Sequence, residues 1–201
     1  ARMAEQAPFY IFTAFVFTYG VTTLGASRDL LLTAVLAASV LEFGTIPLFG
    51  HISDLIGRRR MYMIGAAAAG LFGFVYFAMV DTRNPTLIFL AIVLSLVPHS
   101  MMCGPQAALI AESFTGRLRY SGASLGYQLA SVIAGGPAPL IATALFAYYH
   151  SGYAIAVYVF VCGVLSLFAA SRLGDYTNKD ISQEYDEPRS MGDRGHGHRH
   201  A

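Results

Sequence analysis

Residues 30–80 read LLLTAVLAASVLEFGTIPLFG (30–50), HISDLIGRRR (51–60) and MYMIGAAAAGLFGFVYFAMV (61–80). The two outer segments are apolar, and each has the length of about 20 residues that crosses a bilayer as a helix. Neither shows the strict alternation of polar and apolar residues that marks a strand. The connection between them is short and polar, and it ends in three arginines. We therefore predict two membrane-spanning helices joined by a basic loop over residues 51–60.

Apolar runs of the same kind continue on both sides of this pair. The chain is 55% hydrophobic and only 12% charged, whereas a soluble domain carries about 25% charged residues. The net charge of +1 gives no indication of a nucleic-acid partner, so the expected partner is the lipid bilayer. We predict an all-α integral membrane protein whose bundle covers residues 1–173, with six transmembrane helices at residues 8–26, 30–50, 61–80, 86–111, 122–147 and 152–171.

The segment 174–201 differs from this bundle in composition. It is polar, and six of the acidic residues of the chain lie in it, so we expect a disordered tail. The end of this segment carries His196, His198 and His200. We expect a solvated end, and weak metal binding by these histidines is the alternative. No motif indicates a cofactor, a metal site or a catalytic residue.

Arginines next to the apolar runs predict the orientation, because basic residues collect in cytoplasmic loops. With the amino terminus in the cytoplasm, only Arg28 and Arg83 face outward. The remaining arginines at helix ends then lie inside, namely Arg58, Arg59, Arg60, Arg117, Arg119 and Arg172. We therefore expect both termini to be cytoplasmic.

Glu42 is interpreted as the only acid deep inside an apolar run. It lies about 18 Å along a helix from Leu30, at about 1.5 Å per residue. A charge near the membrane centre costs about 2.5–3.5 kcal/mol on insertion scales, so its helical face, shared with Ser39 and Thr45, should point into the bundle. Desolvation favours the protonated form of a carboxyl group there, which suits a proton carrier or a substrate contact. The alternative is a structural, hydrogen-bonded Glu.

Further polar side chains lie within the apolar runs. Tyr10, Gln106, Tyr127 and Gln128 are candidates for lining a transport path, although each also fits an ordinary helix–helix contact. His99 suits a proton relay, and a neutral, hydrogen-bonded His is the favoured alternative.

Glycine and proline interrupt two of the apolar runs. Gly135, Gly136, Pro137 and Pro139 lie near the middle of the fifth run, where proline cannot continue a regular helix. The fourth run contains Pro98, Gly104 and Pro105. Broken backbone at this depth survives only against protein or a water-lined cavity, so these breaks are interpreted as hinges or, alternatively, as static kinks.

The connection Gly50-His-Ile-Ser-Asp54-Leu-Ile-Gly57-Arg58-Arg59-Arg60 has the spacing Gly-x-x-x-Asp-x-x-Gly-Arg-Arg. It resembles the signature loop of the major facilitator superfamily, in the copy found in the carboxy-terminal half; Leu55 departs from that pattern, where Arg is frequent. The segment 104–139, from Gly104-Pro105-Gln106 to Gly135-Gly136-Pro137-Ala138-Pro139, resembles the bacterial metabolite:proton symporters, as does the opening Ala7-Pro8-Phe9-Tyr10.

This resemblance implies half of a major-facilitator fold, built from two inverted repeats of three helices. It implies a missing amino-terminal six-helix half, a substrate path between the halves and a place in the bacterial inner membrane. The expected function is transport of an organic acid or zwitterionic osmolyte with protons. Gly50, Gly57 and Arg59 belong to the signature loop, and an inward gate is expected at Asp54, Arg58, Glu112 and Arg119.

Two other functions remain open at this stage. The chain could be an inactive remnant of a truncated gene, which the DNA immediately upstream would reveal. An intramembrane serine enzyme built on Ser124 is disfavoured, because the run 152–171 contains no His to activate the serine. The protein is therefore not expected to be an enzyme.

Overall fold

The computed structural model of the chain describes residues 3–112 and 119–173. Within these ranges the side chains at positions 112, 119–123 and 130 lie outside the description. The expected tail at 174–201 and the side chains of Glu112 and Arg119, assigned to the gate, therefore lie outside the described residues.

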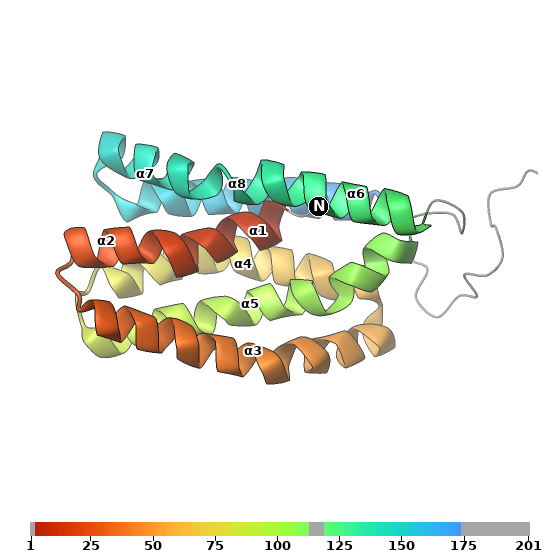
Figure 1. Cartoon of the computed structure of the whole chain (residues 1–201), viewed down its shortest axis with the longest axis horizontal. Coiled ribbons are helices and arrows are strands. Elements are labelled where there is room, and N and C mark those ends of the chain that lie inside the picture. Colours follow the sequence, from red (N-terminus) through yellow and green to blue (C-terminus); the bar gives the residue numbers. More distant parts are fainter. Residues whose placement is uncertain (1–2, 113–118, 174–201) are drawn as a thin grey trace, which may run out of the picture.

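The described residues form helices that run lengthwise beside one another (Figure 1). In Figure 1 the stretch from α1 to α2 runs between α6–α7 above and α3 below. In chain order the helices are α1 (Met3–Tyr10), the π-helix η1 (Ile11–Phe15), α2 (Val16–Thr22), α3 (Arg28–Ile56), α4 (Arg58–Val80), α5 (Pro85–Glu112), α6 (Arg119–Gly135), α7 (Ala138–Tyr149) and α8 (Gly152–Ser171).

Five helices in the described part of the chain are long and apolar enough to cross a membrane. They cover Arg28–Ile56, Arg58–Val80, Pro85–Ala111, Ser124–Tyr149 and Gly152–Ser171. The remaining predicted run, 8–26, falls on α1, η1 and α2, which follow one another without a gap from Met3 to Thr22. The all-helical, membrane-spanning character predicted from the sequence is thus confirmed.

The basic loop predicted at 51–60 is wrong. Helix α3 continues to Ile56 and α4 begins at Arg58, so Gly57 alone separates them. Its φ of 103° lies in a region that side chains avoid and glycine adopts readily. The polar residues before it remain helical: buried Ser53 donates a hydrogen bond to the Gly50 carbonyl at 2.6 Å. The reversal of chain direction therefore depends on one residue.

The predicted backbone breaks are found in one run and not in the other. The fifth run divides into α6 and α7, with Pro137 capping α7. Helix α5, in contrast, runs without interruption through Pro98 and Pro105, so the break predicted there is wrong. Proline removes one backbone hydrogen bond from a helix, and in a membrane bundle neighbouring groups compensate for it.

The α3–α5, α4–α5 and α4–α8 pairs make the most extensive helix contacts. Helices α3 and α5 approach so closely at Gly50 and Gly104 that a Cβ atom on Gly104 would lie 2.7 Å from the Gly50 nitrogen. Nearby, the Thr45 hydroxyl donates to the Ser100 hydroxyl at 2.8 Å. This packing fixes the two helices that carry Glu42 and His99.

The π-helix η1 receives a hydrogen bond from α4. Tyr76, 1% exposed, donates its hydroxyl to the Phe12 carbonyl at 3.2 Å. We expect Tyr76→Phe to lower the free energy of unfolding by about 1–3 kcal/mol, because it leaves a buried carbonyl without its donor. Denaturation in detergent measures this loss. Tyr153→Phe is the control, since Tyr153 is 48% exposed; an equal loss in both variants would contradict a specific role of the Tyr76 hydroxyl.

Candidate functional site

Glu42 on α3 contacts His99 on α5. The Oε1 atom of Glu42 lies 2.5 Å from Nδ1 of His99. Both side chains are largely shielded, with 14% of Glu42 and 11% of His99 exposed. The two helices are held together by the backbone contact at Gly50 and Gly104, so this pair bridges two firmly packed elements.

A second carboxylate lies on the other side of the imidazole ring. Glu5 on α1 places Oε1 3.4 Å from Nε2 of His99, and only 5% of its side chain is exposed. The interpretation of Glu42 as the only deep acid is therefore wrong, and His99 lies between two carboxylates. We call Glu5, His99 and Glu42 the acid–imidazole cluster.

Two glutamine side chains donate hydrogen bonds to Glu5. Gln106 on α5, 2% exposed, donates its amide to Oε2 of Glu5 at 3.2 Å, and Gln6 donates to Oε1 at 3.1 Å. Gln106 was predicted to line a path. In the structure it lies against the buried carboxylate instead of facing open space.

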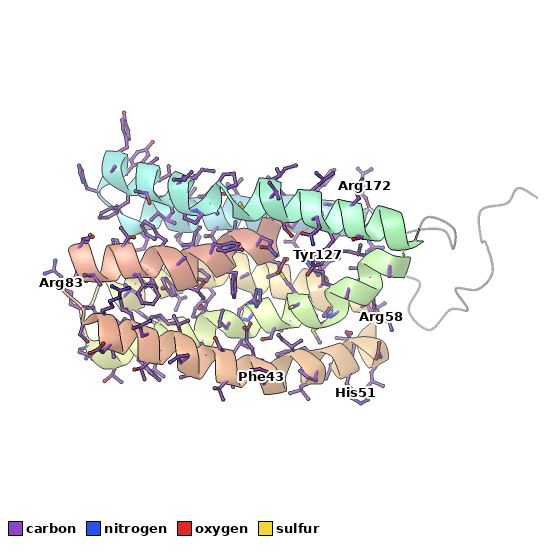
Figure 2. The ribbon with its side chains drawn as sticks, viewed as in Figure 1. Phe43, His51, Arg58, Arg83, Tyr127 and Arg172 are labelled. Atoms are coloured by element: carbon purple, nitrogen blue, oxygen red, sulfur yellow. The ribbon has the colours of Figure 1, made fainter. Side chains whose placement is uncertain are left out.

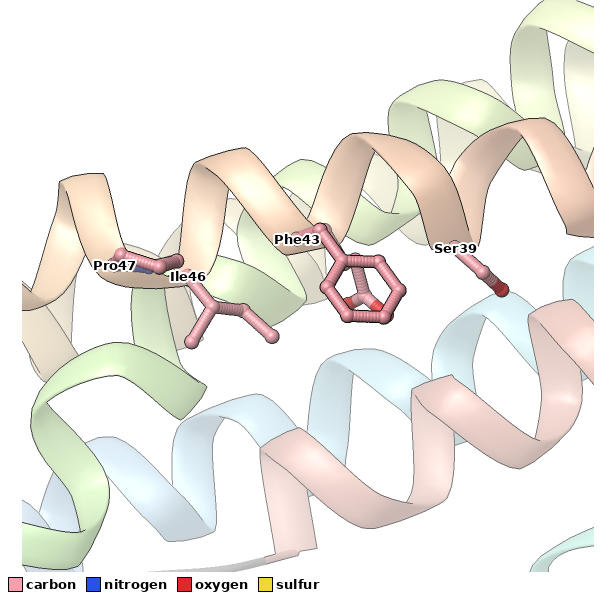
Figure 3. Close-up of a pocket in the computed structure, with 5 residues that line it drawn as sticks. Ser39, Phe43, Ile46 and Pro47 are labelled. Atoms are coloured by element: carbon pink, nitrogen blue, oxygen red, sulfur yellow. The ribbon is translucent and has the colours of Figure 1, made fainter.

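Glu42 also lines a cavity of about 380 Å³. The cavity is open on one side, and Phe43 in its lining is 85% exposed. Figure 3 shows the other lining residues projecting from α3. The lining consists of Ser39, Glu42, Phe43, Ile46 and Pro47. One side chain thus faces both the cavity and His99.

The other predicted path residues lie outside the acid–imidazole cluster. Tyr10 is 39% exposed, and its ring packs where a Cβ of Gly135 would lie, at 2.7 Å. Tyr127, labelled in Figure 2, is 36% exposed on α6, and Gln128 beside it is exposed. These three side chains therefore lie on the surface of the described bundle.

Of the residues expected at the gate, Asp54 and Arg58 have described side chains, and these two pair at one end of the bundle. Figure 2 shows His51, Arg58 and Arg172 at this end and Arg83 at the opposite one. Arg58 pairs with Asp54, with Nε at 3.0 Å and Nη2 at 2.9 Å from the same carboxylate oxygen.

Arg59 ties this end of α4 to α8. Its Nη2 donates to the Ser171 carbonyl at 2.6 Å, and a cation at the carboxyl end of a helix is favourable. The two neighbouring arginines therefore have different contacts, one within the α3–α4 turn and one with the last helix of the bundle.

Sequence reasoning missed Glu5 because it precedes the apolar run at residue 8. No local signal marked the earlier start, because Pro8 lies in the second turn of α1 and proline is ordinarily tolerated only in the first turn of a helix. A helix starting before Pro8 places Glu5 inside the bundle, and α1 does begin at Met3. The contact of Glu5 with His99 joins residues distant in sequence, which periodicity does not reveal.

Comparison with known proteins identifies the family. The sequence model of the Major Facilitator Superfamily matches residues 4–192. The shikimate transporter of Escherichia coli K12 is 34% identical over 176 residues, which cover 87% of this chain and 40% of that protein. The citrate-proton symporter of Klebsiella pneumoniae is 31% identical over 165 residues, covering 79% of this chain and 36% of that protein. No solved structure matches.

The relatives indicate both the class of protein and how much of it this chain covers. The chain spans about two fifths of the length of the shikimate transporter. The alpha-ketoglutarate permease of E. coli K12, 30% identical over 139 residues, covers 68% of the chain and is matched over 32% of its own length. With its apolar helices and a family match over most of its length, the chain is a multi-pass membrane protein that belongs to the Major Facilitator Superfamily.

Proposed function

We propose that this chain is the carboxy-terminal half of a secondary transporter that moves a small polar metabolite together with protons. The names of the relatives support this class of substrate: shikimate, citrate and alpha-ketoglutarate are organic acids. The name of the citrate-proton symporter also supports proton coupling. A zwitterionic osmolyte remains in the substrate class, because a putative proline/betaine transporter of Staphylococcus aureus is 26% identical.

The observation that carries the proposal is the double contact of Glu42. It meets His99 at 2.5 Å and also lines the cavity. Ionisable residues inside a membrane mark proton relays and substrate paths, and each ring nitrogen of an imidazole can either carry a proton or accept one. A substrate in the cavity and a proton on the acid–imidazole cluster therefore both interact with Glu42. Such a shared side chain is required to couple substrate movement to proton movement.

The cavity also supports a second half as partner. Its five lining residues all come from α3, so the opposite wall is left for another part of the transporter. We propose that an amino-terminal six-helix half supplies that wall, and that the metabolite passes between the halves.

The proposed topology has six spans arranged as a 3+3 inverted repeat. The first span comprises α1, η1 and α2, and both termini lie in the cytoplasm of a bacterium. The arginine-rich end containing Arg58, Arg59 and Arg172 faces the cytoplasm, in agreement with the positive-inside rule.

In this topology the Asp54–Arg58 pair, joined by Glu112 and Arg119, forms the inward gate. Exposed ion pairs contribute only about 0–1 kcal/mol, so they can break in each transport cycle. The break at Gly135, Gly136, Pro137 and Pro139 serves as the hinge between α6 and α7.

Uptake of labelled organic acids and zwitterions into proteoliposomes tests the proposal. The chain is reconstituted alone and joined to the six-helix half that precedes it in its gene. We expect uptake of at least one organic acid driven by an inward proton gradient in the joined protein. Absence of uptake for the whole panel, or a stop codon in place of the preceding half, would favour the inactive remnant.

A further inference from the structure

The two carboxylates of the acid–imidazole cluster have different surroundings. Glu42 lines the cavity, whereas Glu5 is enclosed, with 5% of its side chain exposed. The start of α1 is anchored as well, because the buried backbone N–H of Ala4 donates to the Ser166 hydroxyl of α8 at 2.8 Å. Glu5 is thus attached to an anchored segment, and it is not among the residues that line the cavity.

The partners of Glu5 restrict what its oxygens can do. The amide groups of Gln6 and Gln106 point their nitrogens at Glu5, and an amide nitrogen donates but never accepts. Glu5 is therefore an acceptor, and its Oε1 lies 3.4 Å from Nε2 of His99. This arrangement favours a proton on Nε2.

The imidazole ring of His99 is oriented by three neighbours. Nε2 faces Glu5 and Nδ1 faces Glu42. The ring of Phe9 lies against it, with centroids 4.7 Å apart and an angle of 30° between the planes. The proton-bearing nitrogen of a neutral His is set by the hydrogen bond that the other nitrogen makes.

We infer that Glu5 is a positioning residue: with Gln106 it keeps the proton on Nε2 of His99, so that only Nδ1 exchanges a proton with Glu42. This inference rests on the proposed function. In the exchange the Nδ1–H bond of the imidazolium breaks and an O–H bond forms on Oε1 of Glu42. A neutral, Nε2-protonated His99 and a neutral Glu42 result, and Glu42 then releases the proton to the cavity. Glu5 is not among the residues that line the cavity.

Nitrogen-15 spectra of histidine-labelled protein in lipid nanodiscs test the positioning role without requiring transport. His99 is assigned by its loss in His99→Gln. We expect neutral His99 to be the Nε2-protonated tautomer in the wild type, and a substantial Nδ1-protonated population in Glu5→Gln. Asp29→Asn is the matched control, because it neutralises an exposed carboxylate elsewhere. Unchanged signals of the exposed His51 and His150 report that the fold is kept.

Transport by the joined protein provides the second measurement. Glu5→Gln is expected to reduce proton-driven uptake by about tenfold or more, with the KM for substrate exchange unchanged. A loss of about 10–100-fold is typical when the outer hydrogen-bond partner of a metal-binding histidine is removed, and we take the same scale for His99. If Glu5→Gln does not fold, Gln106→Leu is used in its place. Gln106→Leu removes a donor to Glu5, and we expect it to change the tautomer of His99 in the same direction.

The outcomes separate the two proposals. If the His99 tautomer and the proton-driven uptake both stay at their wild-type values in the variants, Glu5 has no positioning role. Proton-coupled transport stands in that case. If the wild-type protein has the expected His99 tautomer but shows no proton-driven uptake, the proposed function is refuted. The role of Glu5 in placing the proton on Nε2 then still holds.

Discussion

Replacing Glu42 by Gln is expected to abolish proton-driven accumulation of substrate while exchange of internal for external substrate persists. Glutamine keeps the shape of the side chain and its place beside His99 but cannot carry the proton. Loss of a positioned proton-transfer group reduces rates by about 10²–10⁴-fold, and we expect accumulation to fall by about 100-fold. Exchange needs no net proton movement, so it remains.

Parallel uptake and exchange assays on proteoliposomes measure this difference. Asp29→Asn is the matched control, because it makes the same change from carboxylate to amide at an exposed position of α3 that does not line the cavity. The control should retain accumulation close to the wild-type value, because a surface substitution away from a special feature usually changes stability by less than about 0.5 kcal/mol. Unchanged accumulation in Glu42→Gln would remove Glu42 from the coupling mechanism.

Substituting Gly104 by Ala is expected to destabilise the bundle and to impair transport. The added Cβ would lie 2.7 Å from the Gly50 nitrogen and 2.9 Å from the Ile46 carbonyl oxygen. Both are backbone atoms, so the conflict is relieved only by moving α3 away from α5. Overpacking of this kind costs about 1–3 kcal/mol. The same movement separates Glu42 from His99, whose contact spans these two helices.

Thermal unfolding in detergent and uptake under a proton gradient provide the two measurements. Gly44→Ala on α3 is the control, since nothing lies within 4 Å of a Cβ placed there. In a helix alanine is favoured over glycine by about 1 kcal/mol, so the control is expected to be neutral or slightly stabilising. Equal stability of the two variants would show that α3 and α5 do not meet at Gly50 and Gly104.

Much of the fold follows from local sequence. The run 152–171 is helix α8 with the predicted bounds, because it is apolar throughout and Ser151 caps its start by accepting from the Tyr153 N–H at 3.3 Å. Pro137 ends the regular hydrogen bonding of α6–α7 as expected. The polar side chains in 51–56 predict a loop, whereas the structure continues α3 to Ile56. Polarity at the end of a spanning helix marks the membrane surface and does not end the helix.

The candidate site was predictable only in part. Glu42 stands out because a single acid in an apolar run is costly. Glu5 lies outside any apolar run, and the roles of His99 and Gln106 depend on contacts between α1, α3 and α5. Sequence periodicity identifies the helix face on which a residue lies, but not the residue that contacts it from another helix. The acid–imidazole cluster was therefore visible only in the structure.

Proton movement on addition of substrate tests the coupling claim most directly. The joined protein is reconstituted into lightly buffered proteoliposomes without an imposed gradient, and external pH is recorded as the transported organic acid or zwitterion is added. We predict alkalinisation of the external medium during substrate entry in the wild type, and none in Glu42→Gln. Substrate entry without any change in external pH would contradict it.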